Sequence, residues 1–389
     1  MKLAYVVPRY GDEVVGGAEL AVRMLAERVA ARPGTEVEVL TTRAVDARSW
    51  ANEYAEGTTT LRGVRVHRFT ATGRRADFDA ASVPFLSRPE ALSPAEEQEF
   101  LRMQGPVAPA LVDAVRASDA DLVVASPYLF DPVVAAVRAA PERAVLHPAA
   151  HDEAVLRLPL FRQLFGTVRA LVFYTHAEQQ LVWRRFGVAT TPQVVLGLGC
   201  DAMPGDEAAA RERLGVGDRP YVLCLGRVEG AKGTDALARA FARYKDRHPG
   251  PLALVYVGPV GSPPPAHADV VVAGAVDDPT KWGALRGALA LVSPSPYESF
   301  GLVVLEAWVA GTPVVVNAAC AATREHCERS GGGLWARDYE ELEVALRRLE
   351  SSAILRADLS RAGERYARTR FAWASLTDRY STFLQRLIR

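Results

Sequence analysis

Short apolar runs alternate with longer stretches of helical periodicity along almost the whole chain, and this alternation restricts the fold more than any other feature. The runs of the first half are nearly all apolar, as strands buried on both faces are. They are Lys2–Pro8, Glu36–Thr41, Val64–Phe69, Asp121–Ser126, Arg143–His147 and Ala170–Thr175. Strands that alternate with helices predict an α/β fold in which helices cover a parallel sheet.

The alternation breaks over residues 197–218, which are rich in glycine, and then resumes. Such a segment is typical of a linker between domains. A chain of 389 residues is also too long for one ordinary domain and comfortable for two. We therefore predict a domain of residues 1–198, a second of residues 199–369, and a terminal helix within residues 370–389. The predicted strands of the second domain are Tyr221–Leu225, Leu252–Val257, Val270–Ala273, Leu289–Ser293 and Pro313–Asn317.

Composition excludes several classes of protein. Lys plus Arg and Asp plus Glu each number 46, so the formal net charge is zero and no general nucleic-acid surface is expected. No apolar run approaches the roughly 20 residues of a membrane-spanning helix, and residues 1–8 lack the features of a signal peptide. The 4 cysteines form no CxxC pair, which favours a reducing cytoplasm over a disulfide framework. Peripheral contact with the inner face of a membrane stays open.

The strongest candidate site is residues 293–307, SPSPYESFGLVVLEA. A buried strand is predicted to end at the first of these residues, and a helix to begin near Phe300 or Gly301. Ligands of open α/β sheets bind beyond the carboxyl ends of strands, and the free N–H groups of a helix start bind anions. Glu298 and Glu306 flank this start and suit hydrogen bonding to sugar hydroxyls on either side of a phosphate. Two solvated glutamates at a helix start are the alternative.

A second candidate is the loop GRVEGAKG at residues 226–233, between the first strand of the second domain and a helix. Arg227 and Lys232 lie in this one loop, where both side chains can reach a diphosphate. An arginine fork binds two phosphate oxygens, and a lysine adds a mobile point charge. An ordinary basic turn between strand and helix is the alternative.

Two further motifs follow strands of the first domain. Glycines at Gly16 and Gly17 let the backbone approach a ligand beside the next helix N-terminus, although tight turns also need glycine. The segment HPAAHDE carries His151, which we assign to a site, and His147, which we interpret as a core histidine. No GxSxG is present, so a hydrolase built on a nucleophile elbow is excluded.

Together these four motifs resemble those of glycosyltransferase family 4, whose members are retaining enzymes with the GT-B fold. The resemblance runs along nearly the whole chain and is more specific in the second domain than in the first. It implies two Rossmann-like domains that face each other across a cleft, an acceptor-side domain of residues 1–198 and a nucleotide-sugar-binding domain of residues 199–369. It also implies that residues 370–389 cross back and pack on the first domain.

The resemblance assigns roles to the charged residues. Arg227 and Lys232 match the family's GR-x4-KG loop, which is implied to bind the donor diphosphate. Glu298 and Glu306 match its E-x7-E motif. The first glutamate is implied to hold hydroxyls of the transferred sugar, and the second the ribose hydroxyls.

The remaining implied contacts are largely made by backbone groups. Gly16 and Gly17 match the glycine loop that contacts phosphate and acceptor, and His151 matches the family's cleft histidine. Residues 319–325 depart from the family, because ACAATRE stands where many members have a glycine pair before a glutamate, which puts the identity of the sugar in doubt. The amides of Phe300, Gly301 and Leu302 are implied to hold sugar and phosphate, and residues 257–258 and 274–277, among them Val276, to form the base pocket.

The sequence thus predicts a retaining hexosyltransferase that moves a sugar from an α-linked nucleotide sugar, a UDP- or GDP-sugar, to a glycan, lipid-linked or small natural-product acceptor. The nucleotide sugar is a substrate, so no cofactor is expected, and no residue cluster suits a divalent metal. Two alternatives stay open, since a fold does not decide function. One is a nucleotide-sugar-binding protein without turnover, and the other is a nucleotide-sugar epimerase on the same fold.

Overall fold

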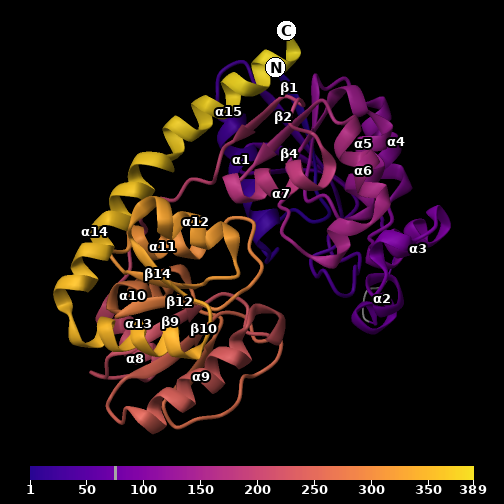
Figure 1. Cartoon of the computed structure of the whole chain (residues 1–389). Helices are drawn as coiled ribbons and strands as arrows, with labels where there is room; N and C mark the ends of the chain where they lie inside the picture. Colours follow the sequence, from indigo (N-terminus) through magenta and orange to yellow (C-terminus); the bar gives the residue numbers. More distant parts are fainter. Residues whose placement is uncertain (74–76) are drawn as a thin grey trace. The chain divides into compact units, whose positions relative to one another are not determined.

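The computed structural model describes residues 1–73 and 77–389. The chain separates into two compact units, each a parallel sheet with helices packed around it (Figure 1). Unit 1 comprises Met1–Gly197 and Thr377–Arg389, and unit 2 comprises Leu198–Leu376. The sequence had suggested a division after residue 198 and a returning segment of residues 370–389. The predicted α/β class with two parallel-sheet domains is confirmed.

Unit 1 contains an 8-stranded sheet in the order β3-β4-β2-β1-β5-β6-β7-β8. All neighbouring strands are parallel except β3, which runs antiparallel to β4. The strands are β1 (Lys2–Val6), β2 (Glu36–Thr42), β3 (Gly57–Leu61), β4 (Val64–Phe69), β5 (Leu122–Ala125), β6 (Ala144–Leu146), β7 (Ala170–Phe173) and β8 (Gln193–Val195).

Helices surround this sheet and supply the other half of its core, in which Phe161 and Phe165 of α6 pack with Leu146 and Phe173 of the strands. Fully burying one such side chain contributes about 1.5–3 kcal/mol. The helices are α1 (Gly17–Ala30), α2 (Phe78–Leu86), α3 (Pro94–Gln104), α4 (Pro109–Ala117), α5 (Asp131–Ala139), α6 (Pro159–Thr167) and α7 (His176–Phe186). Single 3-10 turns lie at Pro89–Ala91, Pro141–Arg143 and Ala154–Arg157.

Unit 2 contains a 6-stranded parallel sheet in the order β11-β10-β9-β12-β13-β14. Its strands are β9 (Tyr221–Leu225), β10 (Ala253–Val257), β11 (Val270–Gly274), β12 (Ala290–Ser293), β13 (Val314–Asn317) and β14 (Gly333–Ala336). Its helices are α8 (Glu207–Leu214), α9 (Thr234–Arg247), α10 (Asp278–Gly287), α11 (Leu302–Val309), α12 (Ala321–Ser330), α13 (Tyr339–Ser351) and α14 (Ala353–Arg370), with a 3-10 turn at Gly230–Lys232. Leu237 and Phe241 of α9 and Leu346 of α13 join one core cluster with the strands.

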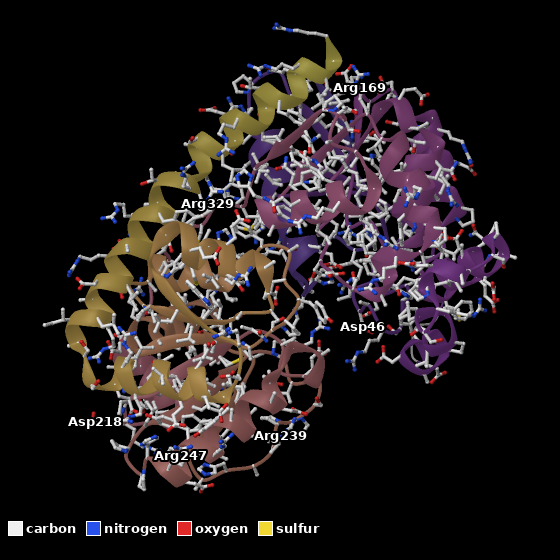
Figure 2. All side chains as sticks on the ribbon, in the orientation of Figure 1. Asp46, Arg169, Asp218, Arg239, Arg247 and Arg329 are labelled. Carbon is white, nitrogen blue, oxygen red and sulfur yellow. The ribbon has the colours of Figure 1, made fainter. Side chains whose placement is uncertain are left out.

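The last helix, α15 (Trp373–Ile388), begins in unit 2, and its residues from Thr377 onward belong to unit 1. This return confirms the crossing implied by the family resemblance. Buried hydroxyls hold it there, since Tyr380 bonds to His147 over 2.9 Å and to Tyr5 over 3.3 Å. Near the chain end, the Arg169 guanidinium donates from Nε to the carbonyl of Leu387 over 2.8 Å. Figure 2 labels Arg169 near the end of α15.

Candidate functional site

The strand order of unit 2 reverses between β9 and β12. From β9 the chain moves outward to β10 and β11, and it then returns to place β12 on the other side of β9. Ligands of open parallel sheets bind beyond the carboxyl ends of the strands at such a switch point. Two loops leave the sheet there, residues 226–233 after β9 and residues 294–301 after β12. Both loops carry motifs that the sequence singled out separately.

An ion pair joins the two loops. Nζ of Lys232 lies 2.8 Å from Oε1 of Glu298, and the side chains are 38% and 27% exposed. Arg227, in the same loop as the lysine, is equally exposed and approaches Glu229 only to 3.9 Å. The structure therefore brings a lysine, an arginine and a carboxylate to one edge of the sheet, within reach of solvent and of a polar ligand.

The helix behind this pair, α11, begins at Leu302, one or two residues later than the sequence suggested. Gly301 caps it in a left-handed conformation with φ of 82°, and a Cβ atom there would lie 2.5 Å from a methyl carbon of Thr323. Only glycine fits this position without strain. The side chain of Phe300 is buried and packs edge-to-face on Phe371, with ring centroids 5.4 Å apart. Its ring therefore anchors the loop that leads into α11. In the first turn of this helix the N–H of Val304 donates to the carbonyl of Gly301 over 2.9 Å, and a helix start of this kind suits an anion.

Glu306, in the second turn of α11, is paired with a different lysine. Its Oε1 lies 3.1 Å from Nζ of Lys281 in α10, and that ammonium also lies 3.0 Å from Asp278. Burial raises the pKa of the Glu306 carboxyl, and the positive charge of Lys281 opposes that rise. Sequence analysis missed Lys281, because a single lysine in an amphipathic helix carries no signal of its partner.

Val276 lies in the loop between β11 and α10, half-buried. The two segments implied to form a base pocket are joined there, because the N–H of Gly258 donates to the carbonyl of Gly274 over 2.8 Å. Asp277 caps α10 by accepting a hydrogen bond from the N–H of Thr280 over 2.9 Å. The loop that carries Val276 is therefore fixed at both ends.

In unit 1, Gly16 caps α1 and Gly17 is its first residue. A Cβ atom on Gly16 would lie 2.2 Å from a carboxylate oxygen of Glu19, so a larger residue here would have to displace that side chain. Glu19 is buried and forms an ion pair with Arg9, whose Nε lies 3.0 Å from Oε1. Sequence analysis missed Arg9 and this pair, which places a balanced charge against the start of α1.

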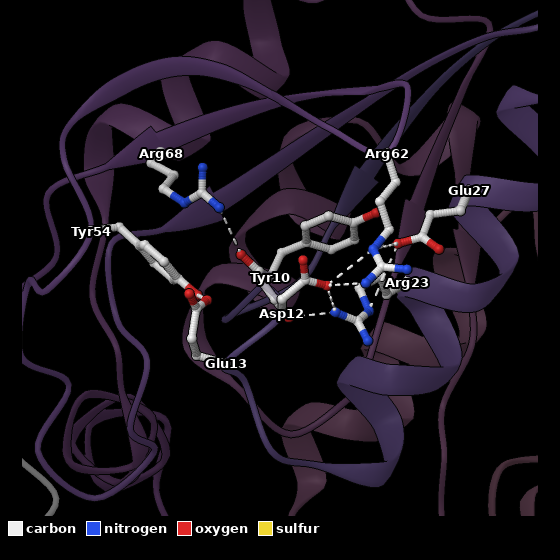
Figure 3. A network of polar contacts seen from close by, with 9 residues as sticks. Tyr10, Asp12, Glu13, Arg23, Glu27, Tyr54, Arg62 and Arg68 are labelled. Atoms are coloured by element: carbon white, nitrogen blue, oxygen red, sulfur yellow. Dashed lines mark hydrogen bonds and ion pairs between the residues drawn. The ribbon is translucent and has the colours of Figure 1, made fainter. Parts of the chain in front are cut away.

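The loop that leads to Gly16 is tied down from several directions (Figure 3). Arg23 of α1 donates to the carbonyl of Gly11 over 3.0 Å, and Arg62 reaches the carboxylate of Asp12 over 3.0 Å. The buried Arg68 of β4 donates to the carbonyl of Tyr10 over 3.0 Å. This loop is therefore held in place within unit 1 without any ligand.

His151 follows β6 and lies beside a carboxylate. Its Nδ1 lies 3.1 Å from Oε1 of Glu153, and the same oxygen accepts a hydrogen bond from the hydroxyl of the buried Tyr128 over 3.0 Å. His147, by contrast, is buried among the strands, with Nε2 bonded to Tyr380, and burial lowers its pKa to about 3. The structure thus places His147 in the core, as its interpretation from the sequence had it, and leaves His151 partly exposed.

Within the described parts of the chain, no group of three or more His, Cys, Asp or Glu side chains is arranged to hold a metal ion. The cysteines at positions 200, 224, 320 and 327 are unpaired thiols. Among residues 1–73 and 77–389, no helix combines the length and the apolar character needed to cross a bilayer.

Residues 219–352 match the family model described as Glycosyl transferases group 1. The D-inositol 3-phosphate glycosyltransferase of Saccharomonospora viridis is 35% identical over 240 residues, which cover 56% of this chain and 55% of the relative. That of Stackebrandtia nassauensis is 34% identical over 258 residues, covering 60% and 58%. The chain thus spans little more than half the length of the curated relatives it matches.

Solved structures match over nearly the whole chain. Sucrose-phosphate synthase from Thermosynechococcus elongatus is 19% identical with a TM-score of 0.75, over 99% of this chain and 98% of the other. Anabaena Alr3699/HepE, solved in complex with UDP and glucose, is 19% identical with a TM-score of 0.71, over 99% and 100%. At such identities these likenesses show the fold alone, which is GT-B. Together with the family model, which identifies a group 1 glycosyltransferase domain in unit 2, they confirm the predicted resemblance to glycosyltransferase family 4.

Proposed function

We propose that this chain, whose unit 2 carries a group 1 glycosyltransferase domain, transfers a sugar from a nucleotide-sugar donor with retention of configuration. The observation that carries the proposal is the pairing of Lys232 with Glu298 at the switch point of the second sheet. A sugar diphosphate needs cations for its phosphates and acceptors for its hydroxyls. This edge of the sheet offers a cation, Lys232, and an acceptor, Glu298, within hydrogen-bond distance of each other.

In the proposed complex, the diphosphate takes Arg227 and Lys232 as counter-charges and the N–H groups at the start of α11 as donors. The lysine then leaves Glu298, whose carboxylate is free to accept hydrogen bonds from sugar hydroxyls. Glu306, already ordered by Lys281, accepts from the ribose hydroxyls. Val276 and its neighbours in the loop before α10 contact the base.

Negative charge grows on the leaving diphosphate as the glycosidic bond breaks. Preorganised positive charge stabilises that change more than it stabilises the bound donor, which is the requirement for catalysis. We propose that Arg227 and Lys232 supply this charge and that no metal ion or other cofactor takes part. The departing phosphate oxygen accepts the proton of the acceptor hydroxyl, which attacks from the same face.

Unit 1 is proposed to bind the acceptor through the loop at Gly16 and Gly17 and through His151. The matched relatives are named for D-inositol 3-phosphate, which makes small polyols and their phosphates the first acceptors to test. The structural neighbour Alr3699/HepE was solved with UDP and glucose, so UDP-sugars are the first donors to test, followed by GDP-sugars.

A thermal-shift screen of UDP, GDP, ADP and dTDP tests donor binding first, because a ligand that binds only the folded state raises its stability. Release of the nucleoside diphosphate that depends on both donor and acceptor, with a glycosylated product, is the expected result. Binding without release under any acceptor would indicate a protein that binds nucleotide sugars without turnover. An epimerised donor formed without acceptor would indicate an epimerase, and either outcome would overturn the proposal.

A further inference from the structure

One buried glutamate of unit 1 is not among the residues assigned to the proposed reaction. Glu178 lies in the first turn of α7 and is 3% exposed. Its Oε1 accepts the backbone N–H of Ala150 over 2.8 Å, and its Oε2 accepts that of Tyr174 over 2.7 Å. The side chain therefore links the end of β7 to the loop after β6. In that loop His151 directly follows Ala150.

This loop is a strained stretch of chain. Ala149 has φ of 54°, a left-handed conformation that residues with a Cβ atom rarely adopt. The turn is held on both sides of that residue, because the carbonyl of Pro148 accepts the N–H of Tyr128 over 3.1 Å and the N–H of Ala150 reaches Glu178. Strain of this kind persists only where the surroundings over-determine it.

We propose that Glu178 is a positioning residue for the transfer reaction, fixing the backbone from which His151 projects. The inference rests on the proposed function, in which His151 contacts the substrates. Burial raises the pKa of the Glu178 carboxyl to about 8, and the two backbone N–H groups bonded to it oppose that rise. Glutamate suits this place because its two oxygens accept two N–H groups that belong to different segments. A glutamine has one acceptor oxygen, and its amide nitrogen would face an N–H, so one of the two ties would be lost.

The chain offers a matched control. Glu97 of α3 is also buried, and its Oε1 accepts the backbone N–H of Leu160 on another helix of unit 1. A glutamate that only secured the fold would behave as Glu97 does. Glu178→Gln and Glu97→Gln therefore make the same chemical change in the same unit, and only the first touches the His151 loop.

Two readouts separate positioning from stability. Hydrogen exchange of the Ala150 amide, followed by NMR, should be faster in Glu178→Gln, which loses the carboxyl that accepts this N–H, and should keep its wild-type rate in Glu97→Gln. Turnover should fall about 10-fold or more in Glu178→Gln, with the donor KM unchanged, because a small misplacement of a reacting group is costly. Glu97→Gln should keep wild-type turnover, whatever its melting temperature.

Wild-type turnover together with an unchanged exchange rate of the Ala150 amide in Glu178→Gln would overturn the inference, as would equal losses of turnover in both variants. If wild-type protein transfers no sugar, the proposed function fails, and exchange of the Ala150 amide in the two variants still decides whether Glu178 positions that loop. If Glu178→Gln does not fold, hydrogen exchange of the wild-type Ala150 amide decides. Slow exchange supports a buried tie to the carboxylate, and exchange at the rate of an exposed loop overturns it.

Discussion

Lys232 and Glu298, 66 residues apart in the chain, are bonded to each other at the switch point of the second sheet, with Nζ 2.8 Å from Oε1. Each lies in the loop that follows one of two neighbouring strands, β9 and β12. The pair keeps both side chains extended over the same edge of the sheet. In the proposed complex, a sugar diphosphate replaces this ion pair with two interactions, one between its phosphates and Lys232 and one between its sugar hydroxyls and Glu298.

Replacing Lys232 with alanine should lower turnover by about 100-fold or more, the usual loss when one charge-stabilising donor is removed. Stability should change little, because the ion pair is partly exposed and such pairs contribute about 0–1 kcal/mol. Steady-state kinetics with the true donor and acceptor test this, with thermal unfolding as the check on folding. Lys2→Ala, which breaks the exposed pair with Asp119 in unit 1, is the control and should keep full activity. Near-normal turnover of Lys232→Ala would refute the assignment.

The sequence revealed the apolar strands but missed those whose pattern is weak. Strands such as β9 and β10 are buried on both faces and were placed within a residue or two of their bounds. The edge strand β3 reads GTTTL and is almost fully exposed, so it gives no signal of burial. The short strands β8 and β14 lie at sheet edges and are only partly buried. Their extended conformation depends more on pairing with the neighbouring strand than on their own residues.

The site could be predicted only where a motif is local in the chain. Gly301 and Glu298 lie in one short loop, and their short distance in sequence from the predicted helix start was enough to place them in that loop. The pairing of Glu306 with Lys281 spans two helices, and that of Arg9 with Glu19 depends on how a loop folds back. Contacts of this kind follow from packing, and one sequence does not encode them in any readable pattern.

Transfer is expected to survive chelation. Arg227 and Lys232 are proposed to supply the positive charge that a divalent metal supplies in other transferases. Initial rates measured in EDTA and in added magnesium or manganese should agree within error. Strong loss of activity in EDTA, restored by either metal, would assign the phosphate charge to an ion and contradict this prediction.

Lys281→Met should weaken donor binding in a pH-dependent way. Burial already raises the pKa of Glu306, and removing the ammonium that opposes this effect should raise it further. The carboxyl would then bind a proton at a higher pH and accept fewer hydrogen bonds from ribose. Affinity for the nucleoside diphosphate should therefore fall near neutral pH and recover as pH rises, measured by calorimetry across pH 6–9. Lys281→Arg, which keeps the charge, is the control, and identical pH profiles for all three proteins would contradict the prediction.

Acid should destabilise unit 2 through His326. This side chain is buried beside Phe300, with ring centroids 4.9 Å apart, and burial lowers its pKa to about 3. Unfolded chains bind this proton near pH 6.5, so the free energy of unfolding falls as pH drops from about 6.5 towards 3. Between pH 7 and pH 5 the loss is on the order of 2 kcal/mol. His326→Gln should remove that part of the pH dependence in denaturant unfolding, and an unchanged slope would show that His326 is protonated in the folded state.

The stereochemistry of the product separates two mechanisms for Glu298. A double displacement needs a carboxylate nucleophile at the anomeric carbon and leaves a covalent glycosyl-enzyme, whereas an inverting enzyme needs a general base opposite the leaving group. Glu298 lies in the loop that leads into α11, a position that suits hydrogen bonding to sugar hydroxyls in the proposed complex. The acceptor is then expected to attack from the face that the phosphate leaves, and an α-linked donor should give an α-linked product.

Glu298→Gln should turn over slowly because it positions the sugar poorly, and it should accumulate no adduct. Proton NMR of the new linkage tests the first expectation, and a β-linked product would refute it; a sugar adduct on Glu298 in the mass spectrum would establish double displacement instead.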